Sequence, residues 1–329
     1  MSNQSTPTLD IIIPVFNETA VLQTFHSLLC SIVDPLPYTL RIIYVNDGSQ
    51  DDTQRLLEQL ASTDKRLFIL ELSRNFGHQA ALSAGMEISE ADFVLTMDGD
   101  GQHPPTMIPD MLQLAESGYE LVLTQRVDET GKSSFKKETS KWFYRLINQI
   151  GDTNVMPGGA DFRLLSRKVV QAINAMPEYH RFLRGMVSWV GFKTTILPFT
   201  PPKRLAGKSK YSLKKMLRLA SDAIFSFSLV PLYLSIAVGG GFLVLAVIEA
   251  VYVLSFWISG NTQNLAPGWS SLMFMLLLVG GSILISLGLI GMYIGYIFQE
   301  VKHRPNYIIR QVTRSDLTPK PINISQNKE

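Results

Sequence analysis

The sequence predicts an α/β fold with a mostly parallel sheet, followed by a helical region that anchors the chain in a membrane. Short apolar, β-prone segments alternate with segments of helical spacing up to Arg126, and this alternation is typical of βαβ units. Polar residues follow one apolar segment after another, where each strand is expected to end. Late in the chain, two apolar stretches are each long enough to cross a bilayer, which takes about 20 residues.

The expected elements of the sheet domain follow one another with short connections. Apolar runs rich in Ile, Val, Leu and Phe predict strands over residues 9–15, 38–45, 67–72, 93–97 and 120–124. Helical spacing predicts helices over residues 20–33, 53–62 and 106–117, and a further helix that follows residues 75–79 and ends at Ser89. Ser49 or Asp51 is a candidate N-cap for the second of these helices.

The polar residues at the strand ends are Asn17 with Glu18, Asp47, Asn75, Asp98 with Asp100, and Arg126. Folding alone does not require this recurrence, because a strand end needs only turn-forming residues. Ligands of open α/β sheets bind outside the carboxyl ends of the strands, so we expect one shared pocket along that edge. No G-x-G-x-x-G follows the first strand, which disfavours a dinucleotide oxidoreductase, and no G-x-x-x-x-G-K-[ST] of a P-loop is present.

A candidate metal site follows the expected strand at residues 93–97. There, two carboxylates, Asp98 and Asp100, lie one residue apart, with Gln102 and His103 close behind. Mg2+ and Mn2+ take oxygen ligands and commonly keep positions open for substrate phosphates, so this group suits one of these ions. The alternative is a turn at the end of a strand with solvated aspartates.

The composition limits the classes of protein to which the chain can belong. The 329 residues allow one sizeable domain and an additional region. The formal net charge of +2 argues against a protein that binds nucleic acid in bulk. A single cysteine, Cys30, excludes an internal disulfide framework and fits a reducing compartment. Residues 1–10 lack a basic region followed by an apolar core, so we expect no cleaved signal peptide.

Three segments in this order resemble a known family. They are IPVFNE at residues 13–18, VNDGS at residues 45–49 and MDGDGQHPP at residues 97–105. Together they resemble the family-2 glycosyltransferases of GT-A fold, over roughly residues 8–225. More narrowly, the chain is similar to the polyprenyl-phosphate glycosyltransferases, which are relatives of dolichol-phosphate mannose synthase. The two-helix tail makes it most similar to bactoprenol glucosyl transferases of the GtrB type.

The resemblance implies roles for individual residues. Those that bind the donor nucleotide sugar would be Pro14, Asn17, Glu18, Asp47 and Asp98, and the metal ligands would be Asp98, Asp100 and Gln102. It places Asp161 and Arg163 in the active site with Arg126. A loop resembling Arg…Gly-x-Ser-Lys-Tyr would close over donor or acceptor phosphate through Arg204, Ser209 and Lys210.

Asp161 has more than one interpretation. Without the motif we would expect it to cap a helix over residues 162–173. In an active site it would be a general base or an orienting residue. A phosphate monoester has a second pKa of about 6, so an acceptor phosphate is already anionic near neutral pH. The harder task is to bring two anions together, which requires cations such as the metal, Arg126 and Arg163.

The predicted organisation has six parts: a cytoplasmic catalytic domain (1–211), an amphipathic interfacial helix (212–228), a first transmembrane helix (229–258), a short extracytoplasmic loop (259–269), a second transmembrane helix (270–298) and a cytoplasmic tail (299–329), disordered after Arg314. Basic residues flank the two spans, so the positive-inside rule places the catalytic domain and both termini in the cytoplasm. This predicts a multi-pass protein of the inner (plasma) membrane.

Two further basic segments have open interpretations. Residues 132–149 are basic and amphipathic. This segment either covers the site, touches lipid headgroups or forms an ordinary packed helix. Seven Lys and Arg residues in the segment 203–218 either bind phosphate or draw the chain to anionic lipid, at about 1 kcal/mol per charge. Glycines in the spans, such as Gly291 and Gly295, allow close helix contact, so we expect a homo-oligomer.

The function that the resemblance implies is inverting, metal-dependent transfer of a hexose to a polyprenyl phosphate. UDP-glucose and undecaprenyl phosphate are the expected substrates, and GDP-mannose or a modified arabinose donor is the alternative. A processive polysaccharide synthase is disfavoured, because no Gln-x-x-Arg-Trp motif is present and two helices make a poor conduit. A catalytically inactive anchored module is disfavoured by the intact set of Asp98, Asp100 and Gln102.

Overall fold

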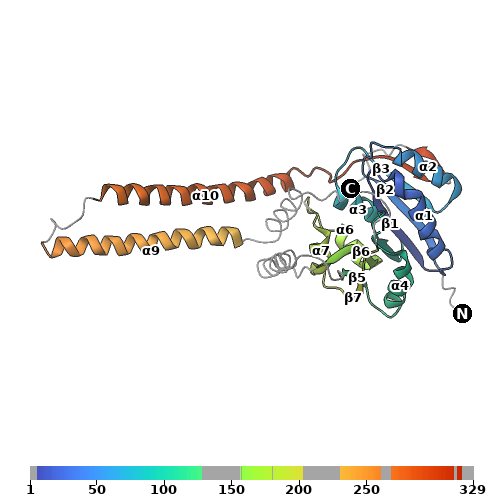
Figure 1. The fold of residues 1–329 in the computed structure, drawn as a ribbon, viewed down its shortest axis with the longest axis horizontal. Coiled ribbons are helices and arrows are strands. Elements are labelled where there is room, and N and C mark those ends of the chain that lie inside the picture. Colours follow the sequence, from blue (N-terminus) through green and yellow to red (C-terminus); the bar gives the residue numbers. More distant parts are fainter. Residues whose placement is uncertain are drawn as a thin grey trace. The chain divides into compact units, whose positions relative to one another are not determined.

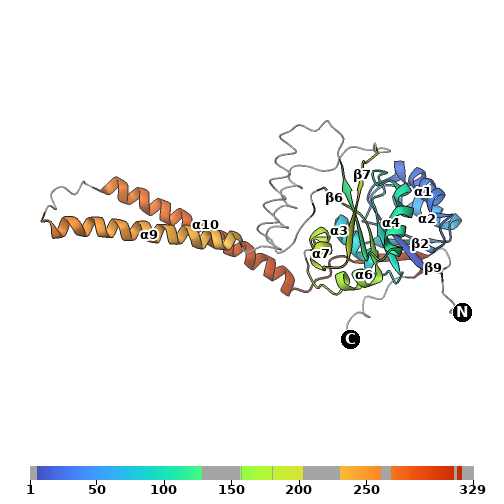
Figure 2. The ribbon, with the colours of Figure 1, turned by 90° about the horizontal axis from the view of Figure 1, so that it is seen from below.

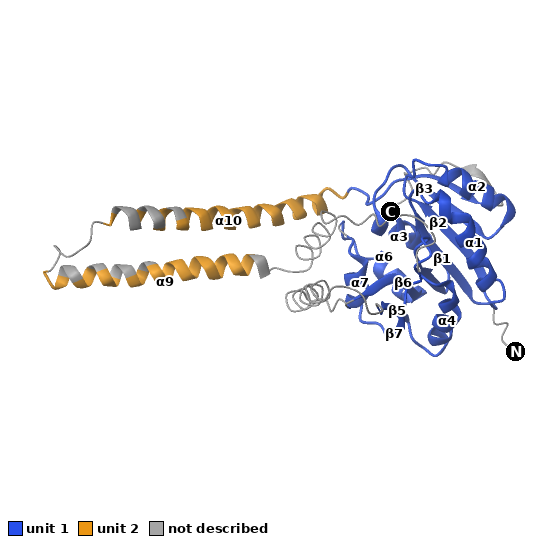
Figure 3. Ribbon diagram, viewed as in Figure 1, with its two compact units in different colours: residues 1–149, 153–219, 304–329 blue, residues 150–152, 220–303 orange. Residues whose placement is uncertain are grey.

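The structure, a computed structural model, describes residues 6–127, 156, 158–179, 181–202, 230–260, 268–314 and 317–320. The chain forms two compact units, one of residues 1–149, 153–219 and 304–329 and one of residues 150–152 and 220–303 (Figure 3). The predicted helices over residues 132–149 and 212–228, and the predicted phosphate-binding residues Arg204, Ser209 and Lys210, lie outside the described residues.

The first unit is built on a nine-stranded sheet with the order β7-β5-β6-β4-β1-β2-β3-β8-β9 (Figure 1). Its strands are β1 (Thr8–Val15), β2 (Thr39–Asn46), β3 (Leu67–Leu72), β4 (Phe93–Thr96), β5 (Leu121–Arg126), β6 (Gly159–Ser166), β7 (Thr194–Phe199), β8 (Ile309–Arg314) and β9 (Leu317–Lys320). All of these described strands except β6 and β8 run in one direction. The prediction of an α/β fold with a mostly parallel sheet is confirmed.

The centre of the sheet is apolar on both faces, as expected for parallel strands that are covered by helices. Ile12 of β1 is opposite Ile43 of β2 and Thr96 of β4 in the parallel registers. Ile11, Ile12 and Ile13 are each fully buried, although successive side chains of a strand point to opposite faces. The strands therefore need helices on both sides.

Helices cover both faces of the sheet (Figures 1 and 2). On one face lie α1 (Thr19–Val33), α2 (Thr53–Thr63), the short 3-10 helix η1 (Pro105–Met107) and α4 (Ile108–Glu116). On the other lie α3 (His78–Glu87), α6 (Arg167–Asn174) and α7 (Leu183–Trp189). A Cβ atom at Gly85 of α3 would lie 2.4 Å from a methyl carbon of Ile12, so α3 packs directly on β1.

The structure corrects the sequence-based expectation that Asp161 caps a helix over residues 162–173. Asp161 lies within β6, which is antiparallel to both β4 and β5, and helix α6 begins only at Arg167. Phe162, Leu164 and Leu165 are buried between these neighbours. Pairing on both sides determines the strand here, and the isolated sequence of β6 does not contain that information.

The end of the chain also differs from the prediction. We expected residues after Arg314 to be disordered, but Leu317–Lys320 forms β9, paired with β8. Strand β8 is antiparallel to β3, with Leu70 opposite Val312. Arg310 adds a salt bridge to Glu71 at 2.8 Å. Residues that follow the second long helix thus cover an edge of the sheet that β3 would otherwise expose.

The second unit contains two long helices, α9 (Val230–Ile258) and α10 (Trp269–Val301), which contact each other. Helical structure at both predicted spans is therefore observed. Among the described residues, one segment, Leu278–Val301, is long and apolar enough to cross a membrane, with a mean hydropathy of 1.9. The other predicted span, at residues 229–258, remains a prediction. Many large apolar side chains of the two helices are exposed, among them Leu234, Ile236, Leu243, Leu284, Ile285 and Ile297.

Candidate active site

The candidate site is built at the carboxyl end of β4. Asp98 follows this strand closely, and β6 runs antiparallel beside it with Arg163 opposite Thr96. This register brings Asp161, near the start of β6, to the same end of the sheet. His78 is the first residue of α3, and its Nε2 atom lies 3.4 Å from Oδ1 of Asp98 and 3.6 Å from Oδ2 of Asp161. Three separate elements therefore meet here.

Asp161 is buried and is held by two guanidinium groups. Its Oδ1 atom accepts a hydrogen bond from Arg163, and its Oδ2 atom accepts one from Nη2 of Arg184 at 2.9 Å. Burial by itself raises the pKa of Asp161, but Arg184, Arg163 and His78 outweigh burial and hold that pKa well below its usual range. A carboxylate of such low basicity favours an orienting role over proton abstraction.

The two arginines differ in their access to solvent. The side chain of Arg163 is 4% exposed, whereas that of Arg184 is 28% exposed. Arg163 also donates to the backbone carbonyl of Leu183 at 3.3 Å, which joins β6 to the start of α7. Arg163 thus lies within the protein, and Arg184 is the one of the two that a bound anion reaches more easily.

His78 lies between two carboxylates. Burial lowers the pKa of its imidazole, but Asp98 and Asp161 outweigh burial and raise that pKa to about 9. The ring is therefore a cation at neutral pH. Together with Arg184, it gives this end of the sheet positive charge beside Asp98, the carboxylate that is 35% exposed.

His103 fixes the backbone of the Asp98 segment. The backbone N–H of Asp98 donates to Nδ1 of His103 at 2.8 Å. A neutral His103 therefore carries its proton on Nε2, which lies 3.7 Å from Oδ2 of Asp98. The His103 ring stacks on Phe162, with the ring centres 5.3 Å apart, and it meets Phe199 edge-on. The aromatic contacts hold the imidazole, and the imidazole holds the Asp98 backbone.

Asp98, Asp100 and Gln102 are all partly exposed, and they fit the predicted divalent cation by the chemistry of their donors. Their carboxylate and amide oxygens are hard ligands of the kind that Mg2+ and Mn2+ take. The Oδ1 atom of Asp100 accepts a hydrogen bond from the backbone N–H of Gln102 at 3.0 Å, so the turn itself keeps these two residues close.

Asp47 supports the segment that carries His78. It is 4% exposed, and its two oxygens accept hydrogen bonds from the backbone N–H groups of Phe76, at 2.7 Å, and Gly77, at 3.0 Å. Burial raises the pKa of this carboxyl group, against the lowering effect of the two bonds. Gly77 has a φ angle of 103°, which glycine adopts readily. The end of β2 thereby fixes the residue immediately before His78.

Gly48 explains part of the Asn-Asp-Gly-Ser motif. Its φ angle is 65°, and a Cβ atom there would lie 2.4 Å from the backbone carbon of Arg74 and 2.6 Å from the backbone nitrogen of Asn75. Only glycine allows the two backbone segments to come this close. Asn46 completes the turn by accepting a hydrogen bond from the N–H of Ser49 at 3.0 Å.

The other predicted donor-binding residues lie beside this turn. Asn17 has a φ angle of 54°; its N–H donates to Oγ of Ser49 at 2.9 Å, and its Oδ1 accepts from the N–H of Gln50 at 2.8 Å. Glu18 precedes α1, and Pro14 lies in β1 opposite Val45. The structure thus groups these residues at the ends of β1 and β2. Their contact with a nucleotide remains a prediction.

Arg126 is the last residue of β5, and its side chain is exposed. Strand β5 runs in the same direction as β4, so Arg126 belongs to the same edge of the sheet as Asp98. Its N–H donates to the carbonyl of Gly158 at 2.9 Å, just before β6 begins. Its predicted role toward phosphate remains a prediction.

Sequence reasoning assigned no role to His78 or Arg184. His78 follows the polar end of β3, so the strand-end pattern that singled out Asn75 could have included it. Arg184 gave no such signal, because it lies at the start of a short helix and its partner Asp161 is on β6. Only the folded chain brings the two together.

Residues 10–173 match the profile of Glycosyl transferase family 2. The chain is 39% identical over 306 residues to the uncharacterized glycosyltransferase YkcC of Bacillus subtilis (strain 168), which covers 92% of this chain and 93% of that protein. It is 37% identical over 311 residues to the uncharacterized glycosyltransferase sll0501 of Synechocystis sp. (strain ATCC 27184 / PCC 6803 / Kazusa), and this match covers 94% of this chain and 97% of that protein. It is 35% identical over 311 residues to the SfII prophage-derived bactoprenol glucosyl transferase of Shigella flexneri, and this match covers 94% of this chain and 99% of that protein.

These matches extend over most of the chain and agree with the resemblance of its strand-end motifs. The family match includes β1 to β4 with the turns that hold Asp47 and Asp98. The fold is the predicted α/β GT-A fold, and the chain is an enzyme. It belongs to glycosyl transferase family 2, among relatives that include bactoprenol glucosyl transferases.

Proposed function

We propose that this protein transfers glucose from UDP-glucose to undecaprenyl phosphate at the cytoplasmic face of the membrane, with inversion at the anomeric carbon. The observation that carries this proposal is the group of Asp98, Asp161, His78, Arg163 and Arg184 at one end of the sheet. Relatives of near-equal length are named bactoprenol glucosyl transferases, which supports the choice of sugar and lipid.

In the proposed reaction, an oxygen of the lipid phosphate attacks the anomeric carbon while the bond from that carbon to UDP breaks. The acceptor needs no general base, because its second pKa is about 6 and its oxygen is already anionic. The low basicity of Asp161 agrees with this. Asp161 instead holds Arg184 and His78, and these cations offset the repulsion between the two anionic substrates.

A divalent cation, Mg2+ or Mn2+, would be held by Asp98, Asp100 and Gln102, and when bound it would offset the charge that develops on the departing diphosphate. The residues proposed to position the donor are Pro14, Asn17, Glu18, Asp47 and Asp98. The residues proposed to interact with the phosphates of donor and acceptor are Arg126, Arg163, Arg204, Ser209 and Lys210. Of these, Arg163 acts through Asp161, because its guanidinium is buried.

We propose that α9 and α10 both span the inner membrane and that the catalytic domain lies on its cytoplasmic side. The exposed apolar side chains of both helices support this, because they would otherwise face water. Basic residues before α9 and after α10 support the orientation. A Cβ atom at Gly291 or Gly295 would meet no described atom within 4 Å, which supports a homo-oligomer that packs through these helices.

The test is incubation of the purified full-length protein with labelled UDP-glucose and undecaprenyl phosphate, followed by extraction into chloroform. We expect labelled glucose in the organic phase, loss of that product with a chelator, and its recovery with added Mg2+ or Mn2+. The variant Asp98→Asn should lose activity, whereas Asp110→Asn, on the exposed surface of α4, should keep it.

Product only from GDP-mannose or a modified arabinose donor would replace the proposed sugar. A long polymer would indicate a processive synthase, and no product with any donor would refute the proposal.

A further inference from the structure

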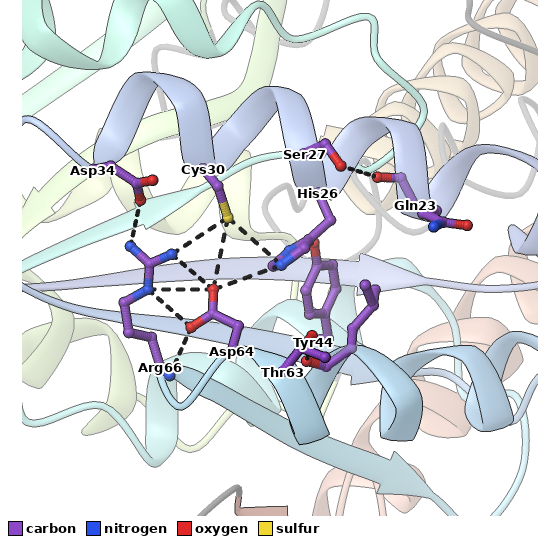
Figure 4. A network of polar contacts seen from close by, with 10 residues as sticks. Gln23, His26, Ser27, Cys30, Asp34, Tyr44, Thr63, Asp64 and Arg66 are labelled. Atoms are coloured by element: carbon purple, nitrogen blue, oxygen red, sulfur yellow. Dashed lines mark hydrogen bonds and ion pairs between the residues drawn. The ribbon is translucent and has the colours of Figure 1, made fainter.

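A second group of reactive side chains lies outside the candidate active site. His26 and Cys30 are one helical turn apart on α1, and Asp64 follows α2 in the connection to β3. Figure 4 shows the three side chains turned toward one another. Nε2 of His26 lies 3.5 Å from Sγ of Cys30 and 3.6 Å from Oδ2 of Asp64. Sγ lies 3.7 Å from the same oxygen.

Within the described part of the chain, one group of three His, Cys, Asp or Glu side chains has potential ligand atoms that all lie within 4.8 Å of one another. That group is His26, Cys30 and Asp64. The group is also distant in topology from the catalytic edge. Asp64 precedes the amino end of β3, whereas Asp98 follows the carboxyl end of β4, and the two strands run in the same direction.

The distances are close to those of a tetrahedral zinc site. Tetrahedral Zn2+ binds sulfur at about 2.3 Å, imidazole nitrogen at about 2.0–2.1 Å and carboxylate oxygen at about 2.0–2.2 Å. With these bond lengths, neighbouring ligand atoms of a tetrahedron lie about 3.3–3.6 Å apart. The separations between the Cys30, His26 and Asp64 atoms are 3.5, 3.6 and 3.7 Å. The three atoms therefore outline one face of a zinc tetrahedron without movement of the backbone.

We propose that His26, Cys30 and Asp64 form a binding site for Zn2+, with water at the fourth position. A thiolate and an imidazole select a borderline-soft ion, whereas Mg2+ and Mn2+ prefer sites made only of oxygen. The zinc site is therefore distinct in chemistry from the group of Asp98, Asp100 and Gln102. Its ion joins α1 to the connection that leads into β3.

The neighbouring residues support the three ligands. The hydroxyl of Tyr44 lies 3.2 Å from Nδ1 of His26 and fixes the ring with Nε2 directed at the site. Arg66 donates to Oδ2 of Asp64 at 2.7 Å and to Oδ1 at 2.9 Å, and its Nη2 lies 3.5 Å from Sγ of Cys30. Arg66 also donates to Asp34 at 2.6 Å.

Arg66 does not prevent the binding of a cation. A carboxylate oxygen has two lone pairs, so Oδ2 of Asp64 accepts from Arg66 and binds an ion with the other pair. Binding replaces the proton of the Cys30 thiol, because a thiolate is the metal ligand. The two positive charges of Zn2+ and the one of Arg66 then balance the negative charges of the Cys30 thiolate, Asp34 and Asp64.

The competing explanation is a purely structural network of hydrogen bonds, and cobalt separates the two. Co2+ occupies zinc sites, and a thiolate ligand gives it an intense charge-transfer band in the near ultraviolet. Cys30 is the only cysteine of the chain, so this band reports on Cys30 even if Co2+ also occupies the oxygen-only site. The experiment uses the full-length protein, purified in detergent under reducing conditions and stripped with a chelator.

We expect the charge-transfer band to saturate at one thiolate-bound Co2+ per chain, together with the visible bands of tetrahedral cobalt. One equivalent of Zn2+ should abolish these bands. Zinc should also raise the thermal midpoint of unfolding. His26→Gln and Asp64→Asn should weaken binding by more than the roughly 10–100-fold that loss of an outer-shell partner costs. Asp34→Asn, which removes a partner of Arg66 but no ligand, is the matched control and should bind cobalt within a few-fold of the parent chain.

Absence of the charge-transfer band in the parent chain would overturn the proposal, whatever the variants do. Unchanged binding in folded His26→Gln and Asp64→Asn proteins would also overturn it, because Cys30 would then bind the ion alone. A visible spectrum of octahedral cobalt would have the same consequence. If the ligand variants fail to fold, the charge-transfer band and the tetrahedral or octahedral visible spectrum of the parent chain still test the proposal.

Discussion

The Nε2 atom of His78 lies 3.4 Å from the Oδ1 atom of Asp98. The same nitrogen lies 3.6 Å from Asp161, so one imidazole connects the start of α3 with the end of β4 and the start of β6. The neighbouring carboxylates raise the pKa of this ring to about 9 against the effect of burial. The charge of His78 at neutral pH is therefore a property of the fold and can be tested.

We expect His78→Gln to lower kcat by about 10²-fold, the size of the loss when one preorganised donor near a developing charge is removed. His78→Lys keeps a positive charge and should recover part of that loss. The measurement is the initial rate of lipid-linked sugar formation for the three proteins. Equal rates for the parent chain and His78→Gln would show that the ring takes no part in the reaction.

The two arginines that hold Asp161 should differ in their effect on stability. The Arg163 side chain is 4% exposed and that of Arg184 is 28% exposed. Breaking a buried ion pair by removal of one partner costs about 3–5 kcal/mol, so Arg163→Met should destabilise the catalytic unit strongly. Arg184→Met should cost less and mainly reduce activity. Thermal unfolding followed by circular dichroism ranks the two variants, and the reverse order would contradict the assignment.

The stability difference between the parent chain and Asp161→Asn should depend on pH in two directions. The pKa of Asp161 is depressed in the folded protein. The stability that this carboxylate adds is therefore complete above the unfolded pKa of about 3.9 and is lost as the pH falls further. The pKa of His78 is raised to about 9, so the stability that comes from the pairing of His78 with Asp161 is lost as the pH rises from about 6.5 towards that value. The difference in unfolding midpoint should therefore be largest near pH 5–6. A difference independent of pH from 3 to 9 would refute this linkage.

Two glycine variants should separate steric clash from backbone strain. At Gly48 a methyl group would lie 2.4 Å from the backbone of Arg74, whereas at Gly77 it would meet no described atom within 4 Å. The φ angle of 103° at Gly77 leaves strain alone, of about 1–3 kcal/mol. Gly48→Ala should therefore lower the unfolding midpoint more than Gly77→Ala. Similar midpoints for the two variants would show that the turn adapts to the added methyl group.

The first part of the fold could be predicted because each strand carries its own signal. The expected strand at residues 67–72 coincides with β3, and the expected helix at residues 20–33 differs from α1 by one residue. The polar strand ends were also visible, since the chain direction of parallel strands brings them to one edge. The pattern thus predicted the region of the candidate site and residues such as Asp98 and Asp47.

What could not be predicted depends on partners distant in sequence. Without the motif, residues 162–173 were expected to form a helix, because the pairing of β6 with β4 and β5 cannot be seen in residues 159–166 alone. The contacts of Asp161 with His78 and Arg184 come from three elements whose order along the edge follows only from the topology. The group of His26, Cys30 and Asp64 was missed for the same reason, although the spacing of His26 and Cys30 on one helix face was visible.

Strand β8 has a consequence for how the protein is made. The sheet of the catalytic unit is completed by residues that follow α10 in the chain. During synthesis, the edge of β3 that pairs with β8 therefore stays unpaired until both long helices have been made. Under the membrane topology proposed above, the sheet is therefore completed only after those helices have been made, and a chain that stalls before Ile309 leaves the sheet unfinished.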